Sequence, residues 1–304
     1  MKIPVPTTRE SIEFESEGRT LRGELRRPEG AGPFPAIVLT HGLAFVIGFF
    51  EHHNFPQFLA GQGFVTLTYD HPNTGLSDGL PRQEIDPIAQ QRAYSDAITY
   101  LSTRADVAPD RIGIWGMSYS GGHVLAVAAS DPRVRCVVAQ TPTVDGRRNL
   151  QRRLSTKQLA EQQRAWAQDR VDRAHGLPPK TLPSGPPAAE QFVASLSTKA
   201  RSSFQPFMTQ RSQEWYFSTI PGTTMPYISP TPLLVIVATD DQVTPAADTR
   251  LAFDQALEPK LLLEVPGGHF DVYGRLYEEC AAAASDWFSR HLRDPSHTKA
   301  NQQR

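Results

Sequence analysis

Short apolar runs alternate with amphipathic segments along most of the chain. Two segments near 10–16 and 19–27, separated by Glu17 and Gly18, predict a β-hairpin. Further strands are predicted by apolar runs near 36–40, 64–70, 111–116, 133–140, 232–239 and 260–266. Helical spacing of apolar residues is seen at 54–62, 87–102, 119–130, 246–257 and 274–292. The alternation predicts an α/β fold, with a mostly parallel eight-stranded sheet covered by helices on both faces.

Residues 146–230 interrupt this alternation. They begin with the basic run Arg147 to Arg153, continue as a Gln/Arg/Ala-rich helix to about Ala174, cross a Pro-rich linker at 177–187, and end in an aromatic-rich helical part. Because this segment falls between two strands of the sheet, we expect a helical cap inserted into one domain. The core is then 1–145 and 231–293, and 294–304 is a polar, flexible tail.

The clearest chemical motif lies where the strand near 111–116 meets the following helix. Ser118 stands there between two small residues, Gly116 and Ser120, as in a nucleophile elbow, where a strained turn projects a serine hydroxyl above the sheet. Ser120 is an alternative nucleophile, since Ser118 and Gly122 flank it in the same way. The strand pattern ends at Trp115, which puts the turn at 117–119 and favours Ser118. A Ser/Gly-rich connection without catalysis is the structural alternative.

A nucleophilic serine needs a base for its proton and a carboxylate to orient that base. Asp240 and Asp241 follow the apolar run at 232–239, and His269 follows the strand near 260–266. All of them fall at carboxyl ends of predicted strands, where open α/β sheets place their sites. The order Ser, Asp, His along the chain is that of α/β-hydrolases and differs from the orders of the two other well-known serine-protease folds. Aspartates that merely cap a helix and an isolated loop histidine are the structural alternatives.

Acyl transfer also needs two backbone N–H groups for the oxyanion. One is predicted at Tyr119, directly after the nucleophile and at the positive end of a helix. The other is predicted in the loop after the strand near 36–40, at Leu43, with Ala44 as the alternative. We expect His41 to be a structural residue at the end of that strand.

Together these motifs resemble the α/β-hydrolase superfamily, in particular the dienelactone-hydrolase-like and X-prolyl-dipeptidyl-peptidase-like branch, which includes hydrolases and acyltransferases that tailor polyketides. The resemblance is carried by His41-Gly42, Asp70 to Gly79, Ile112 to Gly122, Asp131 to Val134, Asp241 to Pro245 and Gly267 to Phe270. It implies the α/β-hydrolase fold and a Ser-His-Asp triad. It also implies an acid four residues before a proline, which selects Asp241 ahead of Pro245 over its neighbour Asp240.

One segment departs from the resemblance. Relatives of this type often carry a Lys-Glu pair shortly after His-Gly, whereas this chain has Phe49-Phe50-Glu51-His52-His53. Phe50 and His52 here, and Trp215 in the insertion, are therefore candidate substrate contacts. Simple packing of these side chains is the structural alternative. Arginines 147 and 148 are further candidates, for an anionic part of the substrate.

Composition excludes several classes of partner. The formal net charge of −1 provides no field for nucleic acid, and no apolar run is long enough to span a membrane. The N-terminus lacks the plan of a signal peptide, and we expect Cys136 and Cys280 to be free thiols in the cytoplasm. Neither a clustered His/Cys metal motif nor a nucleotide-binding glycine motif is present, so we expect no metal and no cofactor.

The sequence therefore predicts a cofactor-independent serine hydrolase that cleaves a carboxylic ester, thioester or lactone through an acyl-enzyme on Ser118. An acyltransferase would use the same residues and differ only in the acceptor. A non-catalytic binding protein is the alternative of a different class. The expected partner is a small-molecule acyl substrate, and the oligomeric state is left open, a homodimer included.

Overall fold

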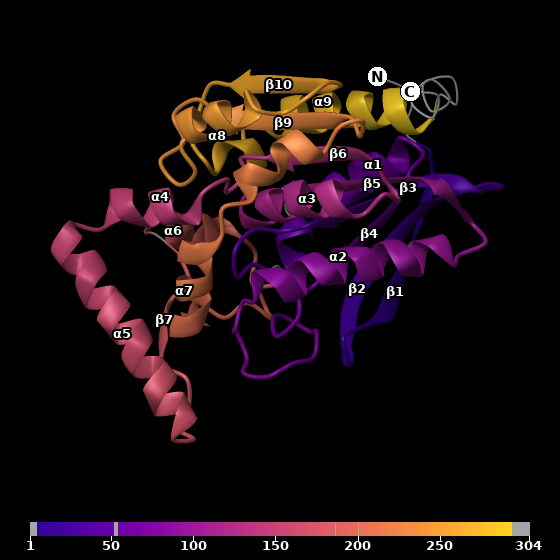
Figure 1. Cartoon of the computed structure of the whole chain (residues 1–304). Helices are drawn as coiled ribbons and strands as arrows, with labels where there is room; N and C mark the ends of the chain where they lie inside the picture. Colours follow the sequence, from indigo (N-terminus) through magenta and orange to yellow (C-terminus); the bar gives the residue numbers. More distant parts are fainter. Residues whose placement is uncertain (1–4, 52–53, 186, 200, 294–304) are drawn as a thin grey trace.

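The computed structural model describes residues 5–51, 54–185, 187–199 and 201–293. Its centre is an eight-stranded sheet in the order β1-β2-β4-β3-β5-β6-β9-β10 (Figure 1). Strands β1 and β2 pair antiparallel, as do β2 and β4, and the remaining pairs are parallel. The strands are β1 (Thr7–Ser16), β2 (Arg19–Pro28), β3 (Phe34–Thr40), β4 (Val65–Tyr69), β5 (Val107–Met117), β6 (Val134–Gln140), β9 (Leu233–Ala238) and β10 (Lys260–Val265). The mostly parallel eight-stranded sheet predicted from the sequence is confirmed.

Both faces of the sheet are buried, because apolar side chains point to each side in turn. On β9, Leu233, Val235 and Val237 face one core, while Leu234 and Ile236 face the other. The first core is covered by α2 (Pro87–Ser102), α3 (Tyr119–Ser130) and α8 (Ala246–Phe253). The second is covered by α1 (Phe55–Gly61) and α9 (Tyr277–Leu292). Uninterrupted apolar runs such as 233–238 are typical of strands that are buried on both faces.

The segment between β6 and β9 lies beyond the carboxyl ends of the parallel strands, with α5 extending away from the core (Figure 1). It contains α4 (Gly146–Arg153), α5 (Thr156–Ala174), β7 (Thr181–Pro183), α6 (Pro187–Ser195), β8 (Phe207–Thr209), α7 (Gln210–Ser218) and the 3-10 helix η2 (Pro221–Tyr227). The Pro-rich stretch is more than a linker, since β7 pairs with β8. Met225 and Ile228 pack into the first core, together with residues of α2, α3 and α8. The last residues of the segment therefore pack with the core, although the sequence analysis assigned them to the insertion.

Ion pairs fasten one side of the insertion to the core. Asp248 of α8 is 5% exposed and pairs with two arginines of α4. Arg148 Nη1 lies 3.2 Å from Asp248 Oδ1, and Arg152 Nη2 donates to the same oxygen at 2.8 Å. Because this carboxylate is buried, it needs both guanidinium groups, and the pairing holds α4 against α8.

Hydrogen bonds fasten the insertion on its other side. The carbonyl of Gln83 accepts from Thr209 N at 3.1 Å, and Ile85 N donates to Ser212 Oγ at 2.8 Å. Between them, the buried Glu84 pairs with Arg173 of α5. The loop before α2 is thus joined to α5, β8 and α7.

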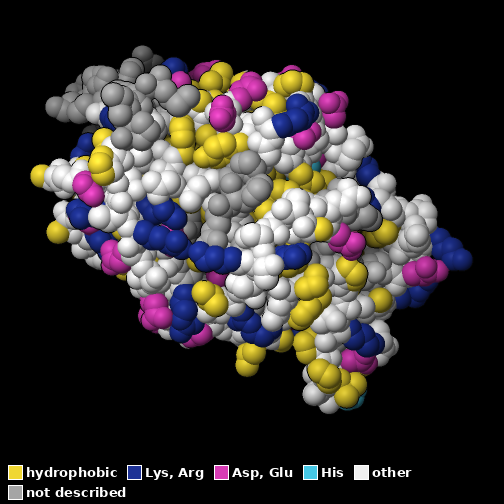
Figure 2. Space-filling view, turned by 180° about the vertical axis from the view of Figure 1, so that it is seen from behind, with side chains coloured by type: hydrophobic (Ala, Val, Ile, Leu, Met, Phe, Trp, Pro, Cys, Tyr) yellow, Lys and Arg dark blue, Asp and Glu magenta, His cyan; other side chains and the backbone are white. Residues whose placement is uncertain are grey.

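On the face shown in Figure 2, side chains of Lys and Arg lie among those of Asp and Glu. None of the helices in the described ranges is long and apolar enough to cross a bilayer. Cys136 and Cys280 are buried free thiols, and burial raises the pKa of each.

Candidate active site

Ser118 occupies a sharp turn between β5 and α3. Its backbone has φ +56° and ψ −113°, a conformation that non-glycine residues adopt only under strain. Two glycines make room for the turn. A Cβ at Gly116 would lie 2.0 Å from the carbonyl oxygen of Ser120, and one at Gly42 would lie 3.1 Å from the Cβ of Ser118. The strand-to-helix turn predicted at 117–119 is therefore present, and its neighbours must stay small.

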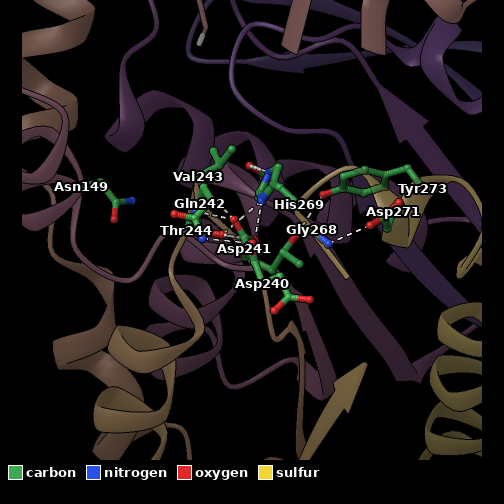
Figure 3. Close-up of polar contacts among 12 residues, drawn as sticks. Asn149, Asp240, Asp241, Gln242, Val243, Thr244, Gly268, His269, Asp271 and Tyr273 are labelled. Atoms are coloured by element: carbon green, nitrogen blue, oxygen red, sulfur yellow. Dashed lines mark hydrogen bonds and ion pairs between the residues drawn. The ribbon is translucent and has the colours of Figure 1, made fainter. Parts of the chain in front are cut away.

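Ser118, His269 and Asp241 form a continuous hydrogen-bonded chain. Ser118 Oγ lies 2.9 Å from His269 Nε2, and His269 Nδ1 lies 2.7 Å from Asp241 Oδ2. His269 is 5% exposed and Asp241 is 4% exposed. Figure 3 shows the Asp241 carboxylate beside the imidazole, while the carboxylate of the exposed Asp240 points away. The structure thus brings together the serine, histidine and aspartate that the sequence analysis favoured.

The loop after β9 holds Asp241 in its ionised form. Its Oδ1 accepts from the backbone N–H groups of Val243 at 2.7 Å and Thr244 at 2.8 Å. Burial opposes ionisation, but the charge and hydrogen bond of His269 and these two N–H groups outweigh it, and the pKa of Asp241 is lowered from its usual 3.8. A carboxylate that stays charged can orient the ring and stabilise its protonated form.

Ser120, the alternative nucleophile, has a different environment. It lies in the first turn of α3, is 1% exposed, and its Oγ is 3.0 Å from Nε2 of His71. His71 also contacts Thr40 Oγ1 at 3.1 Å. Burial, with His41 and His123 nearby, lowers the pKa of His71 well below its usual value. Ser118 lines the cavity of the site, and Ser120 does not.

The two predicted oxyanion residues flank Ser118. Tyr119 is the first residue of α3, and Leu43 lies in the turn after β3. In that turn, Phe45 N donates to Gly42 O at 3.2 Å and Ala44 has φ +59°, so the turn's own hydrogen bond does not use the N–H of Leu43. Leu43 and Tyr119 line the same cavity as Ser118.

That cavity has a volume of about 670 Å³, within the roughly 300–1,000 Å³ of small-molecule sites. Ser118 and His269 line it, and so do residues of the insertion. One wall is aromatic and is built from Phe45, Phe49, Phe192, Phe204, Phe270 and Tyr273. Phe192 of α6 joins these rings. Its ring stacks on Phe270 at 5.0 Å and on Phe45 at 5.9 Å between centroids. The cavity wall near Ser118 is therefore largely apolar.

Of the three predicted substrate contacts, one lines the cavity. Phe50 lines the cavity, and His52 lies outside the described residues. Trp215 does not line it. Its ring lies under the guanidinium of Arg211 at 5.6 Å, because the side of α7 that reaches the cavity carries Gln213 and Tyr216 instead.

The arginines proposed for an anionic group also lie elsewhere. Arg148 pairs with Asp248, and the guanidinium of Arg147 lies 4.7 Å from the ring centroid of Phe217. Neither lines the cavity. Of the arginines in the basic run 147–153, Arg153 lines the cavity. Its Nη2 donates to Val243 O at 2.7 Å.

Sequence reasoning missed three residues of the site. Phe192 gave no signal, since nothing in its local sequence says that α6 folds back over the loop after β10. Tyr273 lies four residues after His269, and the centroids of the two rings are 6.1 Å apart. Thr244 stands between the acid and the proline that marked it, and that position could have drawn attention to it.

Comparisons with known proteins show which family the chain resembles. The sequence model of the X-Pro dipeptidyl-peptidase family (S15 family) matches residues 17–219. A thiohydrolase from Eupenicillium brefeldianum is 31% identical over 92% of this chain and 93% of its own. A polyketide transferase from Stachybotrys chlorohalonatus is 32% identical over 87% and 91%. The crystal structure of the α/β hydrolase GrgF from Penicillium sp. sh18 superposes with a TM-score of 0.81 at 27% identity and covers 94% of this chain and 100% of that one.

Proposed function

The chain belongs to the X-Pro dipeptidyl-peptidase (S15) family and is an enzyme of the α/β-hydrolase type, and from this we propose that it cleaves an ester, thioester or lactone through an acyl-enzyme on Ser118. The observation that carries the proposal is the chain of hydrogen bonds from Ser118 through His269 to Asp241, at 2.9 and 2.7 Å, beside an apolar cavity.

The first half of the reaction acylates the serine. His269 holds its proton on Nδ1, which donates to Asp241, and so its free Nε2 accepts the proton of Ser118 as Oγ attacks the acyl carbon. The N–H groups of Tyr119 and Leu43 stabilise the oxyanion, helped by the positive end of α3. The tetrahedral intermediate then expels its alcohol or thiol, which takes the proton from His269.

The second half releases the acyl group. Water gives a proton to His269 and attacks the ester on Ser118, and the collapse of the second tetrahedral intermediate returns that proton to Oγ. Asp241 stays ionised throughout, because its pKa is held below the usual range, and it offsets the charge of the imidazolium in a site shielded from water.

Acyl transfer to an alcohol or amine is the second candidate function. Two observations favour it: relatives named polyketide transferases share about 30% of their residues with this chain, and the cavity walls are rich in aromatic side chains. A cavity of this size with a largely apolar lining leaves room for an acceptor, which then competes with water for the acyl-enzyme.

The proposal is tested with a fluorophosphonate probe and a panel of p-nitrophenyl esters, thioesters and lactones. We expect the purified protein to be labelled on Ser118, and Ser118→Ala to lose both labelling and turnover. Ser120→Ala, the matched control, keeps both. Product analysis with and without an added alcohol or amine separates transfer from hydrolysis. Full turnover by Ser118→Ala would refute the role of the serine. A wild-type protein that is neither labelled nor active on the panel would refute the proposal and favour a binding protein.

A further inference from the structure

The hydroxyl of Thr244 is surrounded by polar atoms of the Asp241–His269 pair. Its Oγ1 lies 2.9 Å from Asp241 Oδ2, 3.2 Å from His269 Nδ1 and 3.0 Å from the carbonyl oxygen of Thr141. Thr244 is 4% exposed. Because solvent has little access, these contacts are the ones the hydroxyl makes.

Thr244 accounts for half of the hydrogen bonds that Asp241 receives. A carboxylate accepts at about four lone-pair positions. At Asp241 they are filled by the N–H groups of Val243 and Thr244 on Oδ1, and by His269 Nδ1 and the Thr244 hydroxyl on Oδ2. Thr244 lies beside the Asp241 carboxylate (Figure 3) and places one donor on each of its oxygens. Both donors oppose rotation of the carboxylate about its Cβ–Cγ bond.

Thr141, the residue directly after β6, connects the Thr244 hydroxyl to the sheet. It has φ +42°, a strained value for a β-branched residue, and its N–H donates to Ile236 O at 2.7 Å. In this conformation its carbonyl meets the hydroxyl of Thr244, and its own hydroxyl lies 3.2 Å from the Tyr273 hydroxyl. Since Tyr273 also packs its ring against His269, Thr141 is connected to the imidazole both through the acid and through the ring.

We propose that Thr244, held by the carbonyl of Thr141, is a positioning residue that fixes Asp241 so that His269 keeps Nε2 directed at Ser118. The hydroxyl has a single proton, which it shares between Asp241 Oδ2 and Thr141 O, and these two acceptors hold its oxygen between them. This inference rests on the proposed function, because it assigns Thr244 a role through the acid and the base.

Three variants test it. Thr244→Val removes the hydroxyl and keeps the shape, and we expect kcat to fall roughly tenfold with KM unchanged, as for a lost hydrogen bond to a charged group. Thr244→Ser restores the hydroxyl and most of the rate. Thr249→Val is the matched control: it makes the same change at a residue of α8 that is 1% exposed, and it leaves kcat unchanged.

The pH profile separates positioning from mere folding. A carboxylate that has lost one donor attracts the ring proton more strongly, so the acidic limb of kcat/KM moves to higher pH in Thr244→Val. Among the described residues, the other titratable side chains that line the cavity with His269 are His41, Tyr119, Arg153, Glu190, Arg201, Tyr216 and Tyr273, and the variant leaves all of them in place. A purely structural role would lower the folded fraction without moving this limb.

A spectroscopic readout does not depend on turnover. We expect the proton between His269 Nδ1 and Asp241 to give a low-field NMR signal. In Thr244→Val we expect this signal to shift and the proton to exchange faster with water. Wild-type kcat, pH profile and signal in Thr244→Val would overturn the inference, as would Thr244→Ser behaving like the valine variant. If Ser118 proves unreactive, the proposed function fails, while the signal still tests the contact of Thr244 with the pair.

Discussion

Replacing Asp241 by Asn tests the role of the acid with little change of shape. The backbone N–H groups of Val243 and Thr244 require an acceptor, so the amide oxygen takes the place of Oδ1. The amide NH2 then faces His269 Nδ1, which must give up its proton and accept. That proton moves to Nε2, where it blocks the transfer from Ser118.

The magnitude follows from the lost charge. The carboxylate and the imidazolium are in direct hydrogen-bonding contact, and at roughly 4 Å between charge centres and an effective dielectric constant of about 20 their attraction is about 4 kcal/mol. At about 1.36 kcal/mol per factor of ten, kcat falls roughly 10³-fold.

The assay is kcat on a p-nitrophenyl ester across a pH series, with thermal melting to check that the variant is folded. Asp240→Asn is the matched control, because that neighbour is exposed and points away from the ring (Figure 3). A loss of less than about tenfold in Asp241→Asn, or a larger loss in Asp240→Asn, would refute the reasoning.

Three further predictions follow from the geometry. Gly116→Ala places a Cβ 2.0 Å from the carbonyl of Ser120, so we expect about 3 kcal/mol or more of destabilisation in urea unfolding, and an unchanged midpoint would contradict this. Phe192→Ala removes the ring that stacks on Phe270, and kcat/KM across a chain-length series should shift toward longer esters; an unmoved optimum would rule out Phe192 as a wall. The lowered pKa of Asp241 means that its ionised form stabilises the fold above pH 3.8, and this contribution is lost as pH falls through the lower folded-state pKa. The Tm difference between wild type and Asp241→Asn should therefore narrow in acid, and a constant difference would speak against it.

The core and the central residues could be predicted because their signals are local. A strand buried on both faces needs an unbroken apolar run, as at 233–238, and a serine on a tight turn needs small neighbours such as Gly116. The ends of parallel strands meet at one edge, so Ser118 and His269 could be placed together before any distance was known. The local pattern was not enough to identify the acid, because Asp240 and Asp241 differ only in the direction in which the turn after the strand points their side chains.

The rest depends on contacts between distant segments. Trp215 and Tyr216 are adjacent aromatic residues of α7, and only the packing of that helix decides that the second one reaches the cavity. Phe192 meets Phe45 and Phe270 through a fold of the insertion that has no short-range pattern. The carbonyl of Thr141 reaches the hydroxyl of Thr244 because Thr141 has a strained positive φ, and its neighbours in the sequence do not predict this conformation. The boundaries of the cap stay a prediction, apart from the packing of η2 against the core.

The helices of the insertion are attached to the core by different kinds of contact, and this bears on the path by which a ligand would reach the serine. Helix α4 is fastened by the buried Asp248, and α7 by hydrogen bonds to Gln83 and Ile85. Helix α6 meets the loops of the core through apolar contacts, among them those of the Phe192 ring, and such contacts are non-directional. Under the proposed function we therefore expect an apolar acyl group to enter beside α6, where it can replace the contacts of the ring that it displaces.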